Sequence, residues 1–411
     1  MLDQSPVTQD AAARSAPQPV VDVIDAYEAF EALRPAWNAL FARDPEATLF
    51  LSWAWLAEGL SENPRRWRIF VARNPHQLSQ IVAVLPLRLR VHWSREREEF
   101  TTECDAAGRL LHSLWTGLLC DPDWEEAAMP ALARAAAQTP WTELSLRYVR
   151  STRRAEAFAA AFDPAEFRLS WKTYTVNKGA TDNLVAPRLV LPLSFETWLQ
   201  SAPSRDMQDL IRRTGRRYLD SGRWRLTRSD ADTHARDREA LLALWVAERG
   251  VKNGSDEAQA LVEGFRSRID LARRLGSLDL SVLWDGDAPV GAVAHLLDHD
   301  MDRMHLLLMG RDPGDAPGAP ELILIPESIR WGIDQGFDRY EFGAGDQPWK
   351  FAFGAQRREM RYFALRRRAA PRAFALDRLC LPDAVERVAE MVRMGKTERA
   401  QQGLDQLKQL V

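Results

Sequence analysis

The chain of 411 residues contains little cysteine, little lysine and little net charge. Its three cysteines, Cys104, Cys120 and Cys380, lie far apart in the sequence, which excludes both a disulfide framework and the paired spacing of a zinc site. Cysteine used in this way is typical of a reducing compartment. The net charge of −3 supplies no overall field that would attract nucleic acid, so DNA is not expected as a partner.

The sequence also lacks a long apolar run. No segment approaches the ~18 residues needed to cross a bilayer, and the N-terminus has no apolar segment of the kind found in secretory signals. We therefore expect a cytoplasmic protein. Residues 1–19 are polar and rich in alanine and proline, and we expect them to be disordered.

The most informative stretch of the sequence is RYEFGAGDQPWKFAFG, residues 339–354. It begins as a short strand over residues 339–342 and continues into a glycine-rich turn. Asp346 and Lys350 are four residues apart, so they would share one face if this turn is helical. Taken alone, that spacing indicates an ordinary surface ion pair.

The preceding segments place this turn in a larger pattern. An apolar strand is predicted over residues 304–309, a Gly/Pro loop over 310–319 and a helix over 320–336, where apolar residues recur at helical spacing. Pro326 conflicts with a continuous helix, because it removes one backbone hydrogen bond. The alternative is a strand over residues 321–325 followed by a helix from Pro326.

The run PGAPELILIPESIRWGIDQGFDRYEFGAGDQPWKFAFGA resembles the signature of the CelD/FemAB-like acyltransferases of the GNAT superfamily. In the matching pattern Trp349 replaces the usual tyrosine, and Glu341 takes the usual aspartate position. The resemblance is strongest over residues 205–368, and it implies a fold that binds acyl-CoA between two splayed parallel strands. The positions that carry it are Gly336, Asp338, Phe342, Gly343, Gly345, Asp346, Trp349, Lys350, Phe353 and Gly354.

The order of predicted elements, together with this resemblance, indicates an α/β fold with mixed sheets and two GNAT-like halves in tandem. We predict an N-terminal half over residues 20–187, a C-terminal acyltransferase half over 188–370, and a helical tail over 371–411. A strand over residues 359–367 is expected to complete the C-terminal half.

The resemblance also implies where an acyl donor would bind. The donor carbonyl would meet the backbone of the apolar strand at Leu308, Met309 and Gly310. The pyrophosphate would lie at Gly318 and Ala319, because free N–H groups and the helix dipole favour an anion at a helix start.

The same resemblance assigns Lys350 to the oxyanion or to a phosphate, and places Trp349 at the substrate. Asp346 is expected to act as the general base or to position Lys350 through an ion pair. His305 is a second candidate for the base, because it lies on the strand that should flank the donor and histidine titrates near neutrality.

Arginines recur on one side of a helix predicted over residues 204–220. Arg212 and Arg216 belong to this stripe and would meet phosphates of a substrate. A solvated face of an amphipathic helix explains the same pattern, and the two interpretations are balanced.

We therefore expect an acyltransferase that moves an acyl group from acetyl-CoA or another acyl-CoA to an amine or hydroxyl of a sugar, polysaccharide or cell-envelope precursor, without a metal. Peripheral contact with a membrane-bound synthesis complex at the inner membrane is compatible with that acceptor. The first alternative is a FemAB-type peptidoglycan transferase that uses aminoacyl-tRNA. The second is a non-catalytic scaffold within a polysaccharide synthesis complex.

Overall fold

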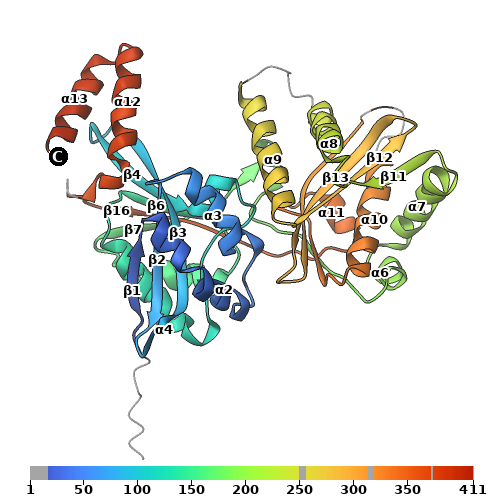
Figure 1. Cartoon of the computed structure of the whole chain (residues 1–411), viewed down its shortest axis with the longest axis horizontal. Helices are drawn as coiled ribbons and strands as arrows, with labels where there is room; N and C mark the ends of the chain where they lie inside the picture. The colour runs from blue at the N-terminus through green and yellow to red at the C-terminus, as the bar shows by residue number, and fades with distance from the viewer. Residues whose placement is uncertain (1–16, 250–255, 313, 315–318, 372–373, 411) are drawn as a thin grey trace, which may run out of the picture.

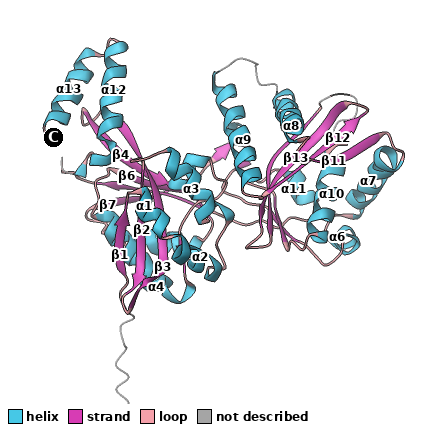
Figure 2. Cartoon of the chain, in the orientation of Figure 1, coloured by secondary structure: helices cyan, strands magenta, loops and turns pink. Residues whose placement is uncertain are grey.

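The computed structural model describes residues 17–249, 256–312, 314, 319–371 and 374–410. The chain forms two lobes side by side, with a pair of C-terminal helices above the first lobe (Figure 1). Each lobe is a mixed sheet flanked by helices (Figure 2). The expected α/β fold in two halves with a helical tail is confirmed.

The sheet of the first lobe has the strand order β1-β2-β3-β4-β6-β16-β7, with β5 beside β3. Its neighbours are antiparallel except for β4 and β6. Strands β2 and β3 form an antiparallel hairpin that turns after Asn74. The strands are β1 (Val20–Ile24), β2 (Trp67–Asn74), β3 (Gln77–Ser94), β4 (Glu99–Ala106), β5 (Leu119–Cys120), β6 (Glu143–Val149), β7 (Phe167–Trp171) and β16 (Arg361–Arg367).

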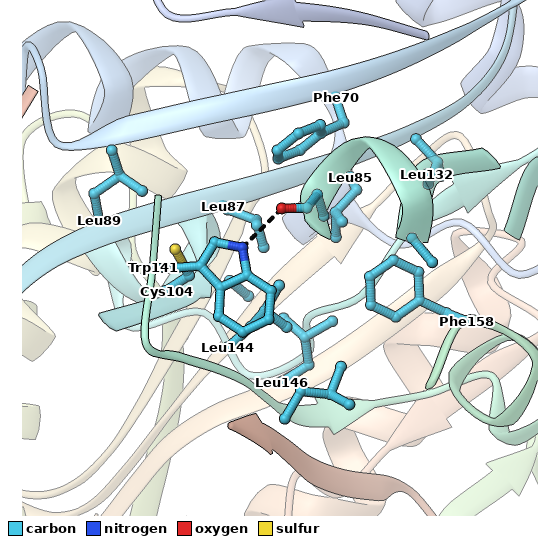
Figure 3. Close-up of a cluster of buried hydrophobic side chains, with 14 of the residues drawn as sticks. Phe70, Leu85, Leu87, Leu89, Cys104, Leu132, Trp141, Leu144, Leu146 and Phe158 are labelled. Atoms are coloured by element: carbon cyan, nitrogen blue, oxygen red, sulfur yellow. Dashed lines mark hydrogen bonds between the residues drawn. The ribbon is translucent and has the colours of Figure 1, made fainter. Parts of the chain in front are cut away.

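Helices cover both faces of this sheet because its central strands are apolar on both faces. Strand β2 is buried over six consecutive residues, as expected for a strand between two helical layers. The buried cluster on one face includes Trp141, whose indole donates to the carbonyl oxygen of Ala136 at 2.8 Å (Figure 3). The helices are α1 (Tyr27–Ala32), α2 (Arg34–Arg43), α3 (Trp53–Glu62), α4 (Glu125–Ala137) and α5 (Thr152–Ala160).

The sheet of the second lobe has the order β10-β15-β14-β13-β12-β11. Only its β14–β15 pair is parallel. A turn after Asp285 joins β12 to β13 as an antiparallel hairpin. The strands are β10 (Arg188–Val190), β11 (Trp224–Arg228), β12 (Leu278–Asp285), β13 (Ala288–Asp298), β14 (Arg303–Arg311) and β15 (Arg339–Glu341).

The helices of the second lobe settle the question raised by Pro326. Helix α10 runs through this proline without a break, so the alternative of a strand over residues 321–325 is wrong. The missing N–H costs one backbone bond, and the burial of Ile323, Ile325 and Ile329 offsets that loss. The helices are α6 (Phe195–Ser201), α7 (Arg205–Gly215), α8 (His234–Arg249), α9 (Asp256–Arg274), α10 (Glu321–Asp334) and α11 (Pro348–Ala352).

The last strand of the chain crosses back to the first lobe. Strand β16 falls within the range predicted for the C-terminal half, yet it pairs with β6 and β7. It does not complete the sheet of the second lobe, and it ties the two lobes together.

The tail contains α12 (Leu381–Arg393) and α13 (Thr397–Lys408), and it packs on the first lobe. Val388 and Leu407 belong to the same buried cluster as Trp141. Across the described residues, no helix combines the length and apolar character needed to cross a membrane.

Candidate active site

The parallel strands β14 and β15 separate part-way along their length. They pair over three positions, the last of which joins His305 to Glu341, where β15 ends. Strand β14 continues to Arg311, and in the described structure no strand pairs with the edge that β15 leaves. A β-bulge on β14 falls at Leu307, because successive residues of β13 face Leu308 and then Leu306. The bulge bends the strand away from its neighbour.

A cavity of about 450 Å³ opens at this separation, and both lobes contribute to its wall. Four of the predicted site residues line it, namely Leu308, Met309, Trp349 and Lys350. The other lining residues are Arg109, His112, Ser113, Leu114, Tyr148, Asn183, Trp245, Glu248, Phe265, Arg268, Leu306, Leu307, Glu321, Phe342, Gly343, Ala344 and Gln347.

Lys350 is buried at the wall of this cavity, with 4% of its surface exposed. The chain reaches α11 through Gly343 and Gly345, whose φ angles of +73° and +99° favour glycine. This turn presents two carbonyl oxygens to the lysine: Nζ donates to Ala344 at 2.7 Å and to Gly345 at 3.0 Å. Burial lowers the pKa of Lys350 to about 7, and the negative charge of Asp346 opposes that effect only in part.

The two carbonyls match the neutral form of the amine. A neutral lysine has two N–H groups, and both are satisfied by Ala344 and Gly345, so its lone pair is free to accept a proton. The ammonium form would carry a third N–H, for which the described residues offer no hydrogen-bond acceptor. A buried lysine of this kind is a candidate general base.

Asp346 does not pair with Lys350. Its Oδ1 accepts the backbone N–H of Asp182 at 2.8 Å, and its Oδ2 lies 3.4 Å from Arg357. The expectation that the two residues share a helical face is wrong, because α11 begins at Pro348. Asp346 instead holds the small hairpin of β8 (Thr175–Val176) and β9 (Thr181–Asp182) against the turn.

Trp349 stands at the cavity beside Lys350 and is partly exposed. Its ring packs edge-on against Phe342 and Phe353, with centroid distances of 5.9 and 6.3 Å. This packing fixes the indole while leaving part of its surface open to the cavity.

His305 is completely buried and does not line the cavity. Its Nδ1 accepts the indole N–H of Trp115 at 3.2 Å, and its Nε2 lies 3.9 Å from Asp298. The ring also packs edge-on against Phe50. The structure therefore places His305 in the contact between the lobes, outside the lining of the cavity.

The predicted donor loop is only partly described. Gly318 lies outside the described residues, and Ala319 packs into the core of the second lobe. At Gly310 an added Cβ would lie 2.4 Å from the backbone nitrogen of Trp245, so α8 requires the glycine there. Neither Gly310 nor Ala319 lines the cavity. At the start of α10, Glu321 pairs with Arg311 at 2.7 Å.

Arg212 and Arg216 are not near Lys350. They line a separate groove between α7 and α10, together with residues such as Leu322 and Pro326. Helix α7 lies at the outer end of the second lobe in Figure 1. Arg212 is exposed and lies 3.9 Å from Asp209, so this stripe has the geometry of a solvated helix face.

Three basic residues that the sequence did not reveal face the cavity. Arg109 and His112 come from the end of the short helix η2 (Ala107–Leu111) in the first lobe, and Arg268 comes from α9. Arg268 donates to the carbonyl oxygens of Gly264 and His112. Neither arginine has a carboxylate within ion-pair distance in the described parts of the chain.

Burial and mutual repulsion both act on the pKa values of these basic groups. Burial, and then the charge of Arg109, lowers the pKa of Arg268 to about 10. The pKa of His112 is lowered by burial and next by Arg268. A bound anion would relieve this mutual repulsion.

Comparisons with known proteins agree with this geometry. Residues 205–351 match the family described as acetyltransferase (GNAT) domain. The crystal structure of FemX covers 84% of this chain and 96% of its own, with a TM-score of 0.56 and 11% identity. No curated protein matches the sequence.

Two further solved structures are similar over most of the chain. A tandem GNAT protein from the clavulanic acid biosynthesis pathway has a TM-score of 0.48 and 11% identity, covering 86% of this chain and 100% of its own. The C-terminal domain of a putative lysylphosphatidylglycerol synthetase from Agrobacterium fabrum has a TM-score of 0.45 and 10% identity, covering 82% and 92%.

The family match includes β14, α10, β15 and Lys350, which together form the opening between splayed parallel strands. The similarity to FemX extends the shared fold to both lobes. Residues 205–351 therefore form a GNAT-type acetyltransferase domain, and the two-lobed fold of the chain is similar to that of FemX.

Proposed function

We propose that the protein transfers an acyl group, with acetyl as the first candidate, from acyl-CoA to an amine or hydroxyl of a sugar, polysaccharide or cell-envelope precursor. The observation that supports this proposal best is the position of Lys350. A buried amine whose pKa is about 7 faces a cavity at the separation of β14 and β15.

The donor would lie along β14. Residues 306–309 line the cavity on a strand edge that has lost its partner. Backbone N–H groups on such an edge can polarise a thioester carbonyl and stabilise the oxyanion that forms on attack. The apolar side chains of Leu308 and Met309 suit the acyl chain and the pantetheine arm.

Lys350 would act as the general base. The acceptor amine or hydroxyl attacks the thioester carbon while its proton passes to Nζ of Lys350. The C–S bond then breaks, and the CoA thiolate takes a proton from the lysine ammonium. The lowered pKa suits this step, because a base that titrates near the working pH is both free and strong enough.

The first lobe would hold the acceptor. Arg109 and Arg268 bring positive charge to the same cavity as Lys350, which supports an acceptor with a phosphate or carboxylate. Trp349 offers an aromatic surface for a sugar ring. A scaffold without activity would be expected to have a closed or filled cleft, whereas this cavity is open.

Titration calorimetry with acetyl-CoA, with CoA as the control, tests the donor. We expect saturable binding of acetyl-CoA that is weakened when Met309→Trp fills the cavity. Absence of binding by acetyl-CoA and by longer acyl-CoA would contradict the proposal and direct the search to aminoacyl-tRNA.

A further inference from the structure

A second cavity of about 450 Å³ lies between the lobes and shares no residue with the first. It sits at the paired end of β14 and β15, where Arg303 faces Arg339 across the parallel ladder. Six arginines line it, namely Arg150, Arg153, Arg188, Arg303, Arg339 and Arg358. Three glutamates accompany them, and two acids outside the lining, Asp338 and Glu125, pair with Arg339 and Arg153.

Arg303 is a buried arginine without a paired carboxylate among the described residues. It is only 5% exposed, and its guanidinium donates to the carbonyl oxygens of Ala47 at 2.6 Å and Pro45 at 3.1 Å. Its Nε has no hydrogen-bond partner among the residues that the structure describes. No carboxylate among the described residues lies within 4 Å of this guanidinium, and a buried charge without a counter-charge is costly.

The neighbouring arginines share too few carboxylates. Glu341 accepts from both Arg150, at 3.0 Å, and Arg188, at 2.8 Å, so one negative charge serves two guanidinium groups. Within the described part of the chain, Nη1 of Arg150 has no hydrogen-bond partner. The charge of Arg150 also adds to the burial that lowers the pKa of Arg303 to about 10.

Not every orphaned atom at this cavity is a donor. Oε2 of Glu46 also lacks a hydrogen-bond partner, and Oε1 of the same carboxylate lies 3.7 Å from Arg153. The negative charge of Glu46 therefore compensates Arg153 and not Arg303. The uncompensated positive charge is concentrated between Arg150 and Arg303.

We propose that this cavity binds a small molecule with linked phosphate groups, such as inorganic pyrophosphate or a nucleoside diphosphate. Guanidinium groups match phosphate oxygens with paired hydrogen bonds. Among the described residues, the guanidinium groups of Arg150, Arg188 and Arg303 have one paired carboxylate, that of Glu341, so two positive charges stay unmatched. A diphosphate can match both charges, whereas a single carboxylate can match only one.

The ligand would join the two lobes. Arg150 belongs to the first lobe, whereas Arg303 and Arg339 begin β14 and β15 of the second. Trp115 of the first lobe lines this cavity and also donates to His305, which precedes the bulge of the active-site strand. Binding here would therefore stabilise the contact on which the geometry of the first cavity depends.

Titration calorimetry of the full chain with pyrophosphate, at low and at high salt, tests this site. We expect saturable binding that falls at least tenfold in Arg150→Gln and weakens with salt. Arg366→Gln is the matched control, because Arg366 is exposed, pairs with Glu143 and lies outside the cavity. Its affinity should equal that of the unchanged protein.

Two further variants keep the result interpretable. Arg358→Gln changes an exposed lining residue, so it provides the test if Arg150→Gln fails to fold. Arg268→Gln removes a cation from the active-site cavity and should leave pyrophosphate binding in place. Absence of binding, equal loss in Arg366→Gln, or loss in Arg268→Gln alone would overturn the proposal.

Discussion

Lys350 donates a hydrogen bond to the carbonyl oxygen of Ala344 at 2.7 Å, inside a cavity where no carboxylate pairs with the amine among the described residues. In this contact the lysine donates a hydrogen bond to the glycine-rich turn that precedes it. The lone pair of the neutral amine stays available to accept a proton. The proposed base, Lys350, therefore needs neither Asp346 nor His305.

Replacement of Lys350 should remove catalysis and leave the fold intact. We expect Lys350→Met to lower the transfer rate by about 10²- to 10⁴-fold, the usual contribution of a general base. Lys350→Arg should be equally impaired, because a guanidinium keeps its proton at neutral pH. The release of free CoA thiol measures both variants, and circular dichroism checks their fold. Transfer near the original rate in Lys350→Arg would rule out the role as base.

The stability of the protein should depend on the titration of Lys350. Its pKa is about 7 in the folded state and 10.5 ordinarily, so between these values the unfolded state binds more protons. Folding stability should therefore rise as the pH increases from about 7 to 10.5. Below pH 7 the folded protein bears the full cost of burying a protonated amine. Relative to Lys350→Met, the original protein should gain roughly 2 kcal/mol between pH 6.5 and 8.5.

Urea denaturation of both proteins at the two pH values measures this difference. Lys350→Met is its own control, because every other titrating group is shared. A constant difference between the two proteins across this range would show that Lys350 is not perturbed.

Loss of Arg268 should affect the acceptor and spare the donor. Arg268→Gln is expected to raise KM for an anionic acceptor about tenfold or more, since a charge-assisted hydrogen bond contributes roughly 1.5–3 kcal/mol. Binding of acetyl-CoA by calorimetry should not change. Arg366→Gln again serves as the control. A weaker donor affinity with an unchanged acceptor KM would move Arg268 to the donor site.

Gly310 should be required for packing. In Gly310→Ala the new methyl group would lie 2.4 Å from the backbone of Trp245, so strand β14 or helix α8 must move. We expect a loss of about 1–3 kcal/mol of stability. Gly215→Ala is the matched control: it lies in α7 with no atom within 4 Å of the new methyl, and it should stabilise by up to ~1 kcal/mol. Equal melting temperatures for the two variants would contradict this account.

The sequence predicted the parts of the site that are local in the chain. Strand β14, the glycine turn, Trp349 and Lys350 lie within about fifty residues, and their spacing carries the family signature. Pro326 was harder to interpret, because only the burial of its neighbours shows that the helix tolerates it.

The rest depends on contacts between distant segments. Arg109 and Arg268 are separated by more than 150 residues, and the abundance of arginine hides the few that lack a carboxylate. The pattern of β16 predicts a strand but cannot say which sheet it joins. Asp346 had the right spacing for an ion pair with Lys350, yet the start of α11 two residues later turned it toward Asp182.

The most direct test of the central claim is an NMR titration of the lysine side chains, which is practical because the chain has only six lysines. With lysine labelled by carbon-13 at Cε, we predict one resonance that titrates near pH 7 and is missing from Lys350→Met. That result would show a neutral amine available as a base at working pH. If the resonance that is missing from Lys350→Met does not titrate below pH 9.5, Lys350 is protonated at working pH. The proposed role of Lys350 as base would then be wrong.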